Sequence, residues 1–185
     1  AYDGGMRFFD TARAYTDSEK KLGLAFSGMR DKIYISSKTM ARTPEEFWKQ
    51  LEESLKMLQT DYIDIYQFHM VPQCYRPGDG TGLYECMLEA KEKGMIRHIG
   101  ITAHLLHVAQ EIAESGLYET LQFPLSYLSS PEDEALARRC AENNMGFIVM
   151  KALAGGLIRN ADAAMAYLLP FENALPIWNP NCQTA

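Results

Sequence analysis

The 185-residue sequence has no apolar run that approaches the roughly 20 residues needed to span a membrane. Its first residues, AYDGG, have neither the basic region nor the apolar stretch of a secretion signal. Acidic residues outnumber basic ones by 24 to 18, which argues against nucleic acid or an anionic membrane as the main partner. We therefore expect a cytoplasmic protein that acts on a small polar molecule.

The four cysteines also lack any pattern that would join them. There is no C-x-x-C, and no Cys/His pairing at the spacings that hold zinc. We expect free thiols that mostly fill the core, namely Cys74, Cys86 and Cys140. Cys182, in the polar tail, is the expected exception. No metal site is predicted.

Seven short apolar segments alternate with segments that have helical patterns. Strands are expected at residues 6–9, 32–38, 62–69, 96–102, 120–126, 146–153 and 174–178. Helices are expected at residues 18–26, 43–58, 83–94, 104–116, 130–144 and 161–169.

Three of these helices carry start signals, and the one at residues 130–144 is expected to open with Ser130 as cap and Pro131 in its first turn. In the second, Thr43 is expected as the cap, Pro44 at the first helical position and Glu46 closing a capping box. In the first, Ser18 is expected to cap, with Leu22, Leu24 and Phe26 facing inward.

The alternation of near-continuous apolar strands with helices indicates a parallel sheet covered by helices. No G-x-G-x-x-G follows the first strand, so a doubly wound dinucleotide-binding fold has little support. A TIM-type (β/α)8 barrel fits better, but it has eight strands and typically about 250 residues. We therefore predict the α/β class and an incomplete barrel over residues 1–178, with an irregular tail at 179–185.

Polar residues that can do chemistry follow three successive strands. Asp10, Lys38 and His69 each lie at a strand end, and Tyr15 comes five residues after Asp10. In a barrel the carboxyl ends of neighbouring strands meet at one mouth. A lysine beside a phenol favours the phenolate, so we expect Lys38 to lower the pKa of Tyr15 and make it a general acid near neutral pH.

In that scheme Asp10 would hold Lys38 charged, and His69 could donate a hydrogen bond to a substrate carbonyl. Each residue also has an ordinary structural role open to it. A strand-end lysine is commonly solvated, and a histidine that closes an apolar run is commonly packed and hydrogen-bonded.

Several segments resemble the aldo-keto reductases in order and spacing. They are FDTARAY, SSK, QFH, LQ and LAGGL. The resemblance implies a TIM-type barrel that binds NADP(H), or less often NAD(H), and reduces an aldehyde or ketone. It also implies that Asp10, Tyr15, Lys38 and His69 are the catalytic tetrad, with Tyr15 as the proton donor.

The resemblance further implies a set of cofactor-binding positions. They are Thr102, Gln122, Met150, Lys151, Leu153, Gly155 and Gly156. Many family members have Ser-Asn where this chain has Thr102 and Ala103, followed by His104, and an aromatic residue where it has Met150. Met150 could equally be the inward end of a barrel strand, and the two glycines a plain turn.

More narrowly, SEKKLG, GITAH and VMKALAGG are similar to a bacterial branch whose full-length members often carry a C-terminal iron–sulfur ferredoxin-like domain. Without clustered cysteines, that domain is expected to be absent here. Family members begin with another strand and helix and continue beyond the last strand found here. We therefore expect a chain truncated at both ends, with exposed sheet edges that could support self-association.

Three functions remain open from the sequence. The first is an NAD(P)H-dependent carbonyl reductase with Tyr15 as proton donor. The second is a non-catalytic nucleotide-binding or scaffold protein on the same fold. The third is a barrel fragment without activity of its own. The four tetrad residues favour the first, and the expected truncation favours the third.

Overall fold

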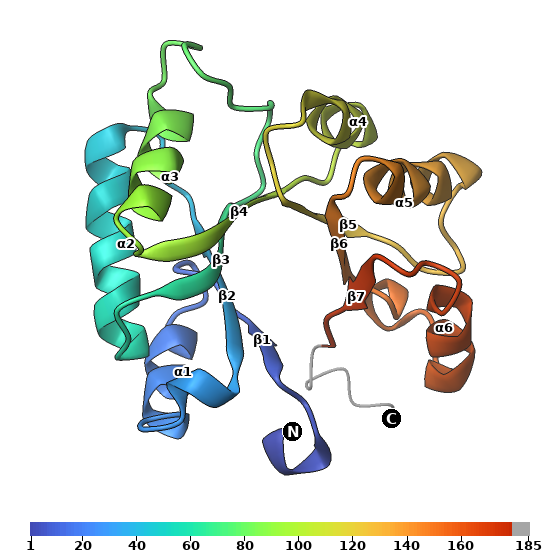
Figure 1. Cartoon of the computed structure of the whole chain (residues 1–185). Helices are drawn as coiled ribbons and strands as arrows, with labels where there is room; N and C mark the ends of the chain where they lie inside the picture. Colours follow the sequence, from blue (N-terminus) through green and yellow to red (C-terminus); the bar gives the residue numbers. More distant parts are fainter. Residues whose placement is uncertain (179–185) are drawn as a thin grey trace. The chain divides into compact units, whose positions relative to one another are not determined.

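The computed structural model describes residues 1–178, and Cys182 and the rest of the tail lie outside the described residues. The chain forms two compact units. The first comprises Ala1–Met70 and Tyr75–Ile101, and the second comprises Val71–Cys74 and the chain from Thr102 onward. Figure 1 shows the elements of both in chain order.

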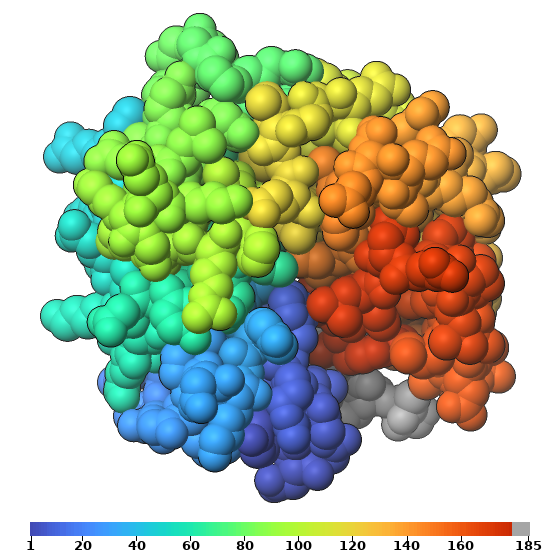
Figure 2. Space-filling view, viewed as in Figure 1, coloured from blue at the N-terminus to red at the C-terminus, as the bar shows by residue number. Residues whose placement is uncertain are grey.

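The first unit is built from parallel strands connected by helices. Its elements are the 3-10 helix η1 (Tyr2–Gly4), β1 (Phe8–Asp10), α1 (Ser18–Ala25), the 3-10 helix η2 (Arg30–Lys32), β2 (Tyr34–Thr39), α2 (Pro44–Leu58), β3 (Ile63–Phe68), α3 (Leu83–Glu92) and β4 (Ile96–Thr102), whose last residue belongs to the second unit. Strands β1 to β4 pair in chain order, all parallel, with Asp10 beside Ser36 and Lys38 beside Gln67. Helices α2 and α3 lie side by side (Figure 1), and their atoms adjoin on the surface shown in Figure 2.

The second unit repeats this strand–helix alternation. Its elements are α4 (Leu106–Ser115), β5 (Thr120–Pro124), α5 (Pro131–Glu142), β6 (Gly146–Met150), the 3-10 helix η3 (Ala154–Gly156), α6 (Ala161–Leu168) and β7 (Ala174–Pro176). Strands β5, β6 and β7 are again parallel and pair in chain order. The alternation predicted from the hydrophobic pattern is confirmed in all seven strand segments and all six helical segments of residues 1–178.

Some strands and helices begin or end at residues other than those predicted. The first strand begins at Phe8 and includes Asp10, so the carboxylate is part of the sheet. The sixth strand ends at Met150, because Lys151 has a left-handed backbone with φ of 57° that ends the extended run. The fourth helix begins at Leu106, after the extended N-cap residue Leu105.

Helix α1 departs furthest from its predicted pattern. Asp17, and not Ser18, is the N-cap, and Leu24 is 59% exposed although it was expected to face inward. The buried residues are Glu19 and Gly23. A Cβ on Gly23 would lie 2.3 Å from the Met57 carbonyl oxygen, so only glycine lets α1 approach the end of α2 this closely.

The start of α2 follows the predicted capping chemistry with one change. The Thr43 side chain accepts a hydrogen bond from the Glu46 amide, and Pro44 is the first helical residue. The Glu46 carboxylate accepts from the amide of Arg42, one residue before the cap. Both amides have a side-chain acceptor, so the helix start is fixed much as the sequence indicates.

Cys74, Cys86 and Cys140 are buried thiols that form no disulfide, as predicted. No helix within residues 1–178 has the length and apolar character to cross a membrane. The same residues contain no group of three or more His, Cys, Asp or Glu side chains that could hold a metal ion.

A buried charge network fixes the amino end of the first unit's sheet. Asp64, 3% exposed, accepts from Arg30 at 2.5 Å and from the Ile35 amide at 2.9 Å, and pairs with Arg97 at 3.3 Å. Both guanidinium groups also lie over the Tyr62 ring, at 4.0 Å and 3.8 Å from its centroid. One carboxylate therefore ties β3 to β2, β4 and η2.

We predict that Asp64→Asn lowers the free energy of unfolding by about 3 kcal/mol, because two cations lose their buried partner. Urea unfolding followed by circular dichroism measures the change. Asp61→Asn is the matched control, since Asp61 is exposed and lies just before the same strand. Its stability is expected to stay within about 0.5 kcal/mol of the parent. Equal stability of both variants would contradict the assigned role of Asp64.

Candidate active site

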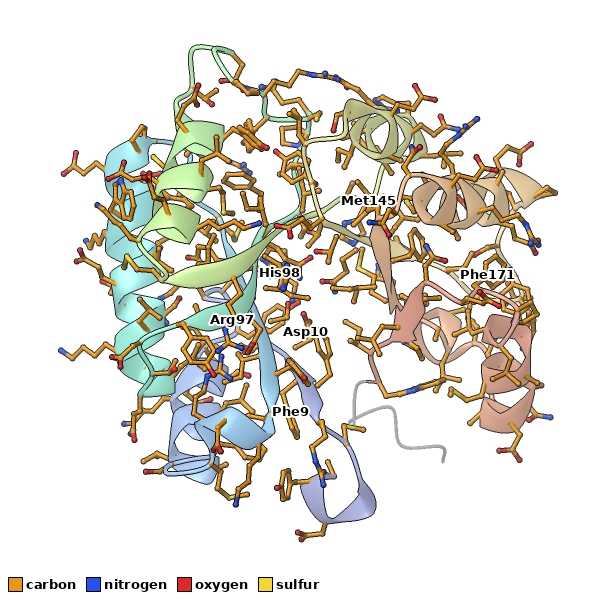
Figure 3. All side chains as sticks on the ribbon, viewed as in Figure 1. Phe9, Asp10, Arg97, His98, Met145 and Phe171 are labelled. Carbon is orange, nitrogen blue, oxygen red and sulfur yellow. The ribbon has the colours of Figure 1, made fainter. Side chains whose placement is uncertain are left out.

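A buried ion pair joins the ends of β1 and β2. The Lys38 ammonium donates to Asp10 Oδ2 at 2.5 Å and to the Thr11 carbonyl at 2.7 Å. The Lys38 side chain is 1% exposed and that of Asp10 is 7% exposed. Asp10 follows Phe9 on β1, and both residues are labelled in Figure 3. Burial would make either charge costly alone, so each depends on the other.

Tyr15 and His69 lie around this ion pair. Tyr15 is in the turn between β1 and α1, and the Lys38 ammonium is 5.3 Å from the centroid of its ring. The His69 ring meets the Tyr15 ring edge-on, with centroids 5.7 Å apart. His69 follows β3, and its amide donates to the Thr39 carbonyl at 2.9 Å. The structure thus brings all four predicted tetrad residues together within the first unit.

The electrostatics of Tyr15 correct one expectation. Partial burial raises the pKa of the Tyr15 phenol above its usual 10, and the negative charge of Asp10 raises it further. The expected lowering of this pKa was wrong, because burial and the charge of Asp10 both act in the opposite direction. Tyr15 is therefore protonated at neutral pH, in the form that can donate a proton.

Lys38 is itself shifted by its surroundings. Burial lowers the pKa of the ammonium, while the charge and hydrogen bond of Asp10 oppose that shift. The neighbouring carboxylate therefore favours the charged form of Lys38, as the sequence led us to expect.

The predicted cofactor residues all belong to the second unit. Thr102, the last residue of β4, is 1% exposed, and Gln122, in the middle of β5, is 2% exposed. The Ala103 amide donates to the Gln122 carbonyl at 3.1 Å, so these two strand positions are held next to each other. Both side chains are polar and buried.

The remaining cofactor candidates follow β6. Met150 is half-buried at the end of the strand, Lys151 is exposed, and Leu153 is half-buried before η3. Gly155 and Gly156 have positive φ of 69° and 99°. Within residues 1–178, no heavy atom beyond their chain neighbours lies within 4 Å of where their Cβ atoms would be. An exposed lysine before an open glycine turn is suited to an anionic group, which can approach the backbone closely.

His104, two residues after Thr102, was not among the predicted site residues. Partial burial lowers the pKa of His104, and the positive charge of Lys151 lowers it further. The charge coupling links the segment after β4 with the segment after β6. In the sequence, the only signal was the replacement of the usual Ser-Asn pair.

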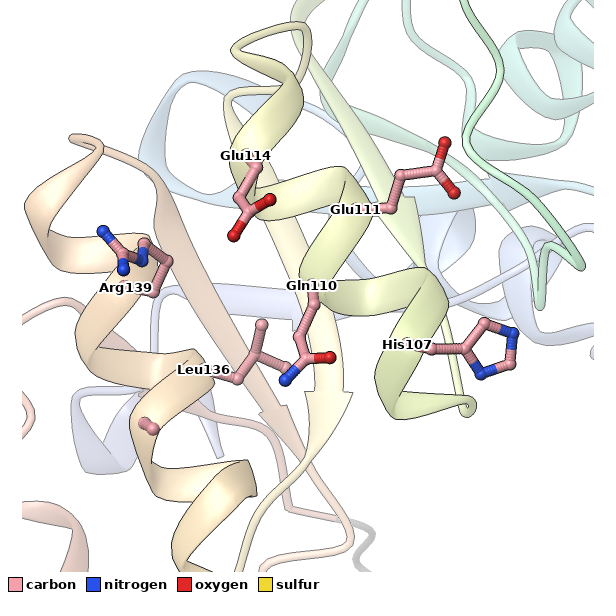
Figure 4. A pocket seen from close by; sticks show the side chains of 7 residues that line it. His107, Gln110, Glu111, Glu114, Leu136 and Arg139 are labelled. Carbon is pink, nitrogen blue, oxygen red and sulfur yellow. The ribbon is translucent and has the colours of Figure 1, made fainter.

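A hollow in the second unit lies between α4 and α5 and has a volume of about 510 Å³. Its walls are mostly polar, and Figure 4 shows the side chains that line it. They belong to His107, Gln110, Glu111, Glu114, Ala135, Leu136 and Arg139. None of the predicted site residues lines it.

The chain is similar in sequence to known proteins. The model of the aldo/keto reductase family matches residues 1–176. The chain is 31% identical over 176 residues to aldo-keto reductase YhdN of Bacillus subtilis, covering 85% of this chain and 51% of that protein. It is 30% identical over 181 residues to methylglyoxal reductase DkgB of Salmonella typhimurium, covering 78% of this chain and 66% of that protein. The chain thus spans about half to two thirds of these relatives.

Solved structures agree on the fold. An aldo-keto reductase from Klebsiella pneumoniae in complex with NADPH superposes with a TM-score of 0.78 at 24% identity, covering 98% of this chain and 72% of that one. A Bombyx mori aldo-keto reductase in complex with NADP gives 0.74 at 19% identity, covering 98% and 73%. The predicted class, α/β with an incomplete TIM-type barrel, is confirmed by this match.

We predict that Tyr15 ionises above pH 10 and that Asp10→Asn lowers its pKa, because a nearby negative charge is removed. Titration of 13Cζ-labelled tyrosine by NMR measures the pKa, and Tyr15→Phe assigns the resonance. Asp17→Asn is the control, since it removes an exposed carboxylate from the same turn. A Tyr15 pKa that is unchanged in Asp10→Asn, or changed equally in Asp17→Asn, would contradict the assigned coupling.

Proposed function

This chain belongs to the aldo/keto reductase family, and we propose that it carries the site for NADPH-dependent reduction of an aldehyde or ketone to an alcohol. The observation that carries the proposal is the cluster formed by Asp10, Tyr15, Lys38 and His69 in the first unit. The reductase names of the relatives support the reaction class.

In this proposal Tyr15 is the proton donor. Reduction of a carbonyl places negative charge on its oxygen, which must take a proton as the alcohol forms. The raised pKa of Tyr15 keeps its phenol protonated at neutral pH, so the proton is available there. His69 lies against the Tyr15 ring, and in this proposal it orients the carbonyl oxygen by a hydrogen bond.

Lys38 and Asp10 have the supporting electrostatic role. Once Tyr15 has given up its proton, the phenolate needs a nearby positive charge, and the Lys38 ammonium lies 5.3 Å from its ring centroid. Asp10 holds that ammonium at 2.5 Å, so the cation is in place before the reaction begins. Preorganised charge of this kind lowers the barrier without further rearrangement.

The cofactor proposed is NADP(H), with NAD(H) as the alternative; when bound, its reduced nicotinamide supplies the hydride. Thr102 and Gln122 would hold the nicotinamide amide, with Met150 and Leu153 against the ring and the adjoining backbone. Lys151, Gly155 and Gly156 would hold the phosphates. The observations that support this assignment are the buried polar pair, the exposed cation and the open glycine turn. The solved neighbours with NADPH and NADP favour the phosphorylated cofactor.

Two other functions remain distinct outcomes. A non-catalytic nucleotide-binding or scaffold protein would bind the cofactor without reducing a carbonyl, and an inactive fragment would do neither. The buried Lys38–Asp10 pair favours catalysis over both, since burying two charges beside a phenol is costly for a site with no chemistry to perform.

We predict that the chain oxidises NADPH in the presence of methylglyoxal, and that Tyr15→Phe lowers kcat about 100-fold or more with the loss of the proton donor. The decrease in reduced-nicotinamide absorbance measures the rate, and cofactor titration measures binding, which the variant should retain. Tyr34→Phe is the control, because Tyr34 is 57% exposed at the start of β2.

The outcomes separate the three functions. Equal rates in Tyr15→Phe and the parent would exclude Tyr15 as donor. Binding of NADPH without oxidation against a panel of aldehydes and ketones would indicate the binding or scaffold function. Absence of both binding and oxidation at millimolar cofactor would indicate an inactive fragment.

A further inference from the structure

Helix α1 carries a buried carboxylate that is bonded to the segments around the tetrad. Glu19 is 2% exposed, and both of its oxygens are used. Oε1 accepts from the Ser37 hydroxyl at 2.6 Å, and Oε2 accepts from the Arg13 guanidinium at 2.5 Å. Glu19 also lies in the first turn of α1, where the partial positive charge of a helix N-terminus favours an anion.

The two partners of Glu19 belong to the segments that carry the tetrad. Ser37 directly precedes Lys38 in β2. Arg13 lies midway between Asp10 and Tyr15, in the turn that follows β1. A single carboxylate is therefore bonded to the strand that carries the lysine and to the turn that carries the tyrosine.

The turn itself is anchored along only part of its length. The amides of Thr11 and Arg13 donate to the Ser36 and Lys38 carbonyls, at 2.8 Å and 3.0 Å, so its first half follows β2. Beyond Arg13, the Tyr15 amide donates within the turn, to the Ala12 carbonyl at 3.0 Å.

Two side-chain bonds connect the first half of the turn to α1, and in the second half the Tyr15 carbonyl accepts from the Ser18 amide at 2.9 Å. The Thr11 hydroxyl donates to the Ser18 hydroxyl at 2.8 Å, and Arg13 donates to Glu19. The bond to Glu19 is charged and mostly buried, which makes it the stronger of the two.

We propose that Glu19 is a positioning residue for the reductase site, holding the Tyr15 turn and the Lys38 strand in fixed relation through Arg13 and Ser37. The inference rests on the proposed function, since it concerns the same tetrad. Glu19 touches neither substrate nor cofactor in this assignment and acts only through its two partners.

The chemistry of the contact distinguishes positioning from plain packing. An apolar side chain of similar size would fill the same space without the cost of burying a carboxylate. The carboxylate instead fixes two separate groups by directional bonds, which packing alone does not do. A displacement of about 1 Å at a reacting group can cost about 100-fold in rate, so such bonds have a kinetic consequence.

The first test is Glu19→Gln, with Glu53→Gln as its matched control. Glu53 pairs with the other side of Arg13 at 3.4 Å and is 44% exposed, so its loss leaves the buried bonds intact. We expect Glu19→Gln to lower kcat at least 10-fold with KM changed less than twofold, and Glu53→Gln to match the parent. Tyr15 pKa by 13Cζ NMR should fall toward 10 in Glu19→Gln and stay unchanged in Glu53→Gln.

The second test is Ser37→Ala, which preserves every charge. The substitution removes one of the two bonds to Glu19. The variant is expected to fold even if Glu19→Gln does not, because alanine is small and apolar and therefore suits a buried site. We expect the same changes at smaller size, with kcat lowered about threefold and a lower Tyr15 pKa. A shift confined to Glu19→Gln would show a charge effect alone and overturn the positioning role, as would parent-like values in both variants.

The phenol titration also separates the two proposals. If the parent binds NADPH but reduces no carbonyl, the proposed function fails, while the Tyr15 pKa in Ser37→Ala still decides whether Glu19 fixes the turn. If the parent is active and Ser37→Ala and Glu19→Gln match it in kcat and in Tyr15 pKa, the positioning role fails and the proposed function stands.

Discussion

The site depends on the burial of the Lys38 ammonium at the end of β2. A lysine that is 1% exposed stays charged only with an anion beside it, and Asp10 is held at that place by the pairing of β1 with β2. The same ammonium donates to the Thr11 carbonyl and so fixes the first residue of the turn that leads to Tyr15. The pairing of β1 with β2 and the Lys38–Asp10 ion pair therefore act together to fix the turn that carries Tyr15.

A second layer of paired charge supports the first. Like Asp10, Glu19 is a buried acid that is bonded to a base. Its base is Arg13, and it also accepts a hydrogen bond from Ser37 of β2. Helix α1 can supply Glu19 because Gly23, one turn later, lets the helix settle against the end of α2. At the opposite end of the strands, Asp64 fixes β2, β3 and β4 in a similar way. The stabilising contacts of Asp64 and the candidate catalytic residues therefore lie at opposite ends of the strands.

Much of this could be predicted from the sequence. Periodicity located the seven strands and six α-helices of residues 1–178, though not the 3-10 helices. The order of Asp10, Tyr15, Lys38 and His69 indicated a shared site, because strand ends follow from topology. The direction of the Tyr15 pKa shift was predicted wrongly, since it depends on how far the folded chain buries the phenol and on the charge of Asp10 beside it. The inward face of α1 was missed for a related reason. Leucines usually mark the buried face, whereas here a bonded carboxylate and a close-packed glycine occupy it.

The central claim is that Tyr15 and Lys38 act as one unit. The most direct measurement is a double-mutant cycle on kcat with Tyr15→Phe, Lys38→Met and the combined variant. The account predicts that each single change removes most of the activity and that the double variant is little worse than either, because groups that act together give non-additive losses. Losses that multiply, so that the double variant falls by the product of the two single effects, would contradict it and show that the two residues contribute independently.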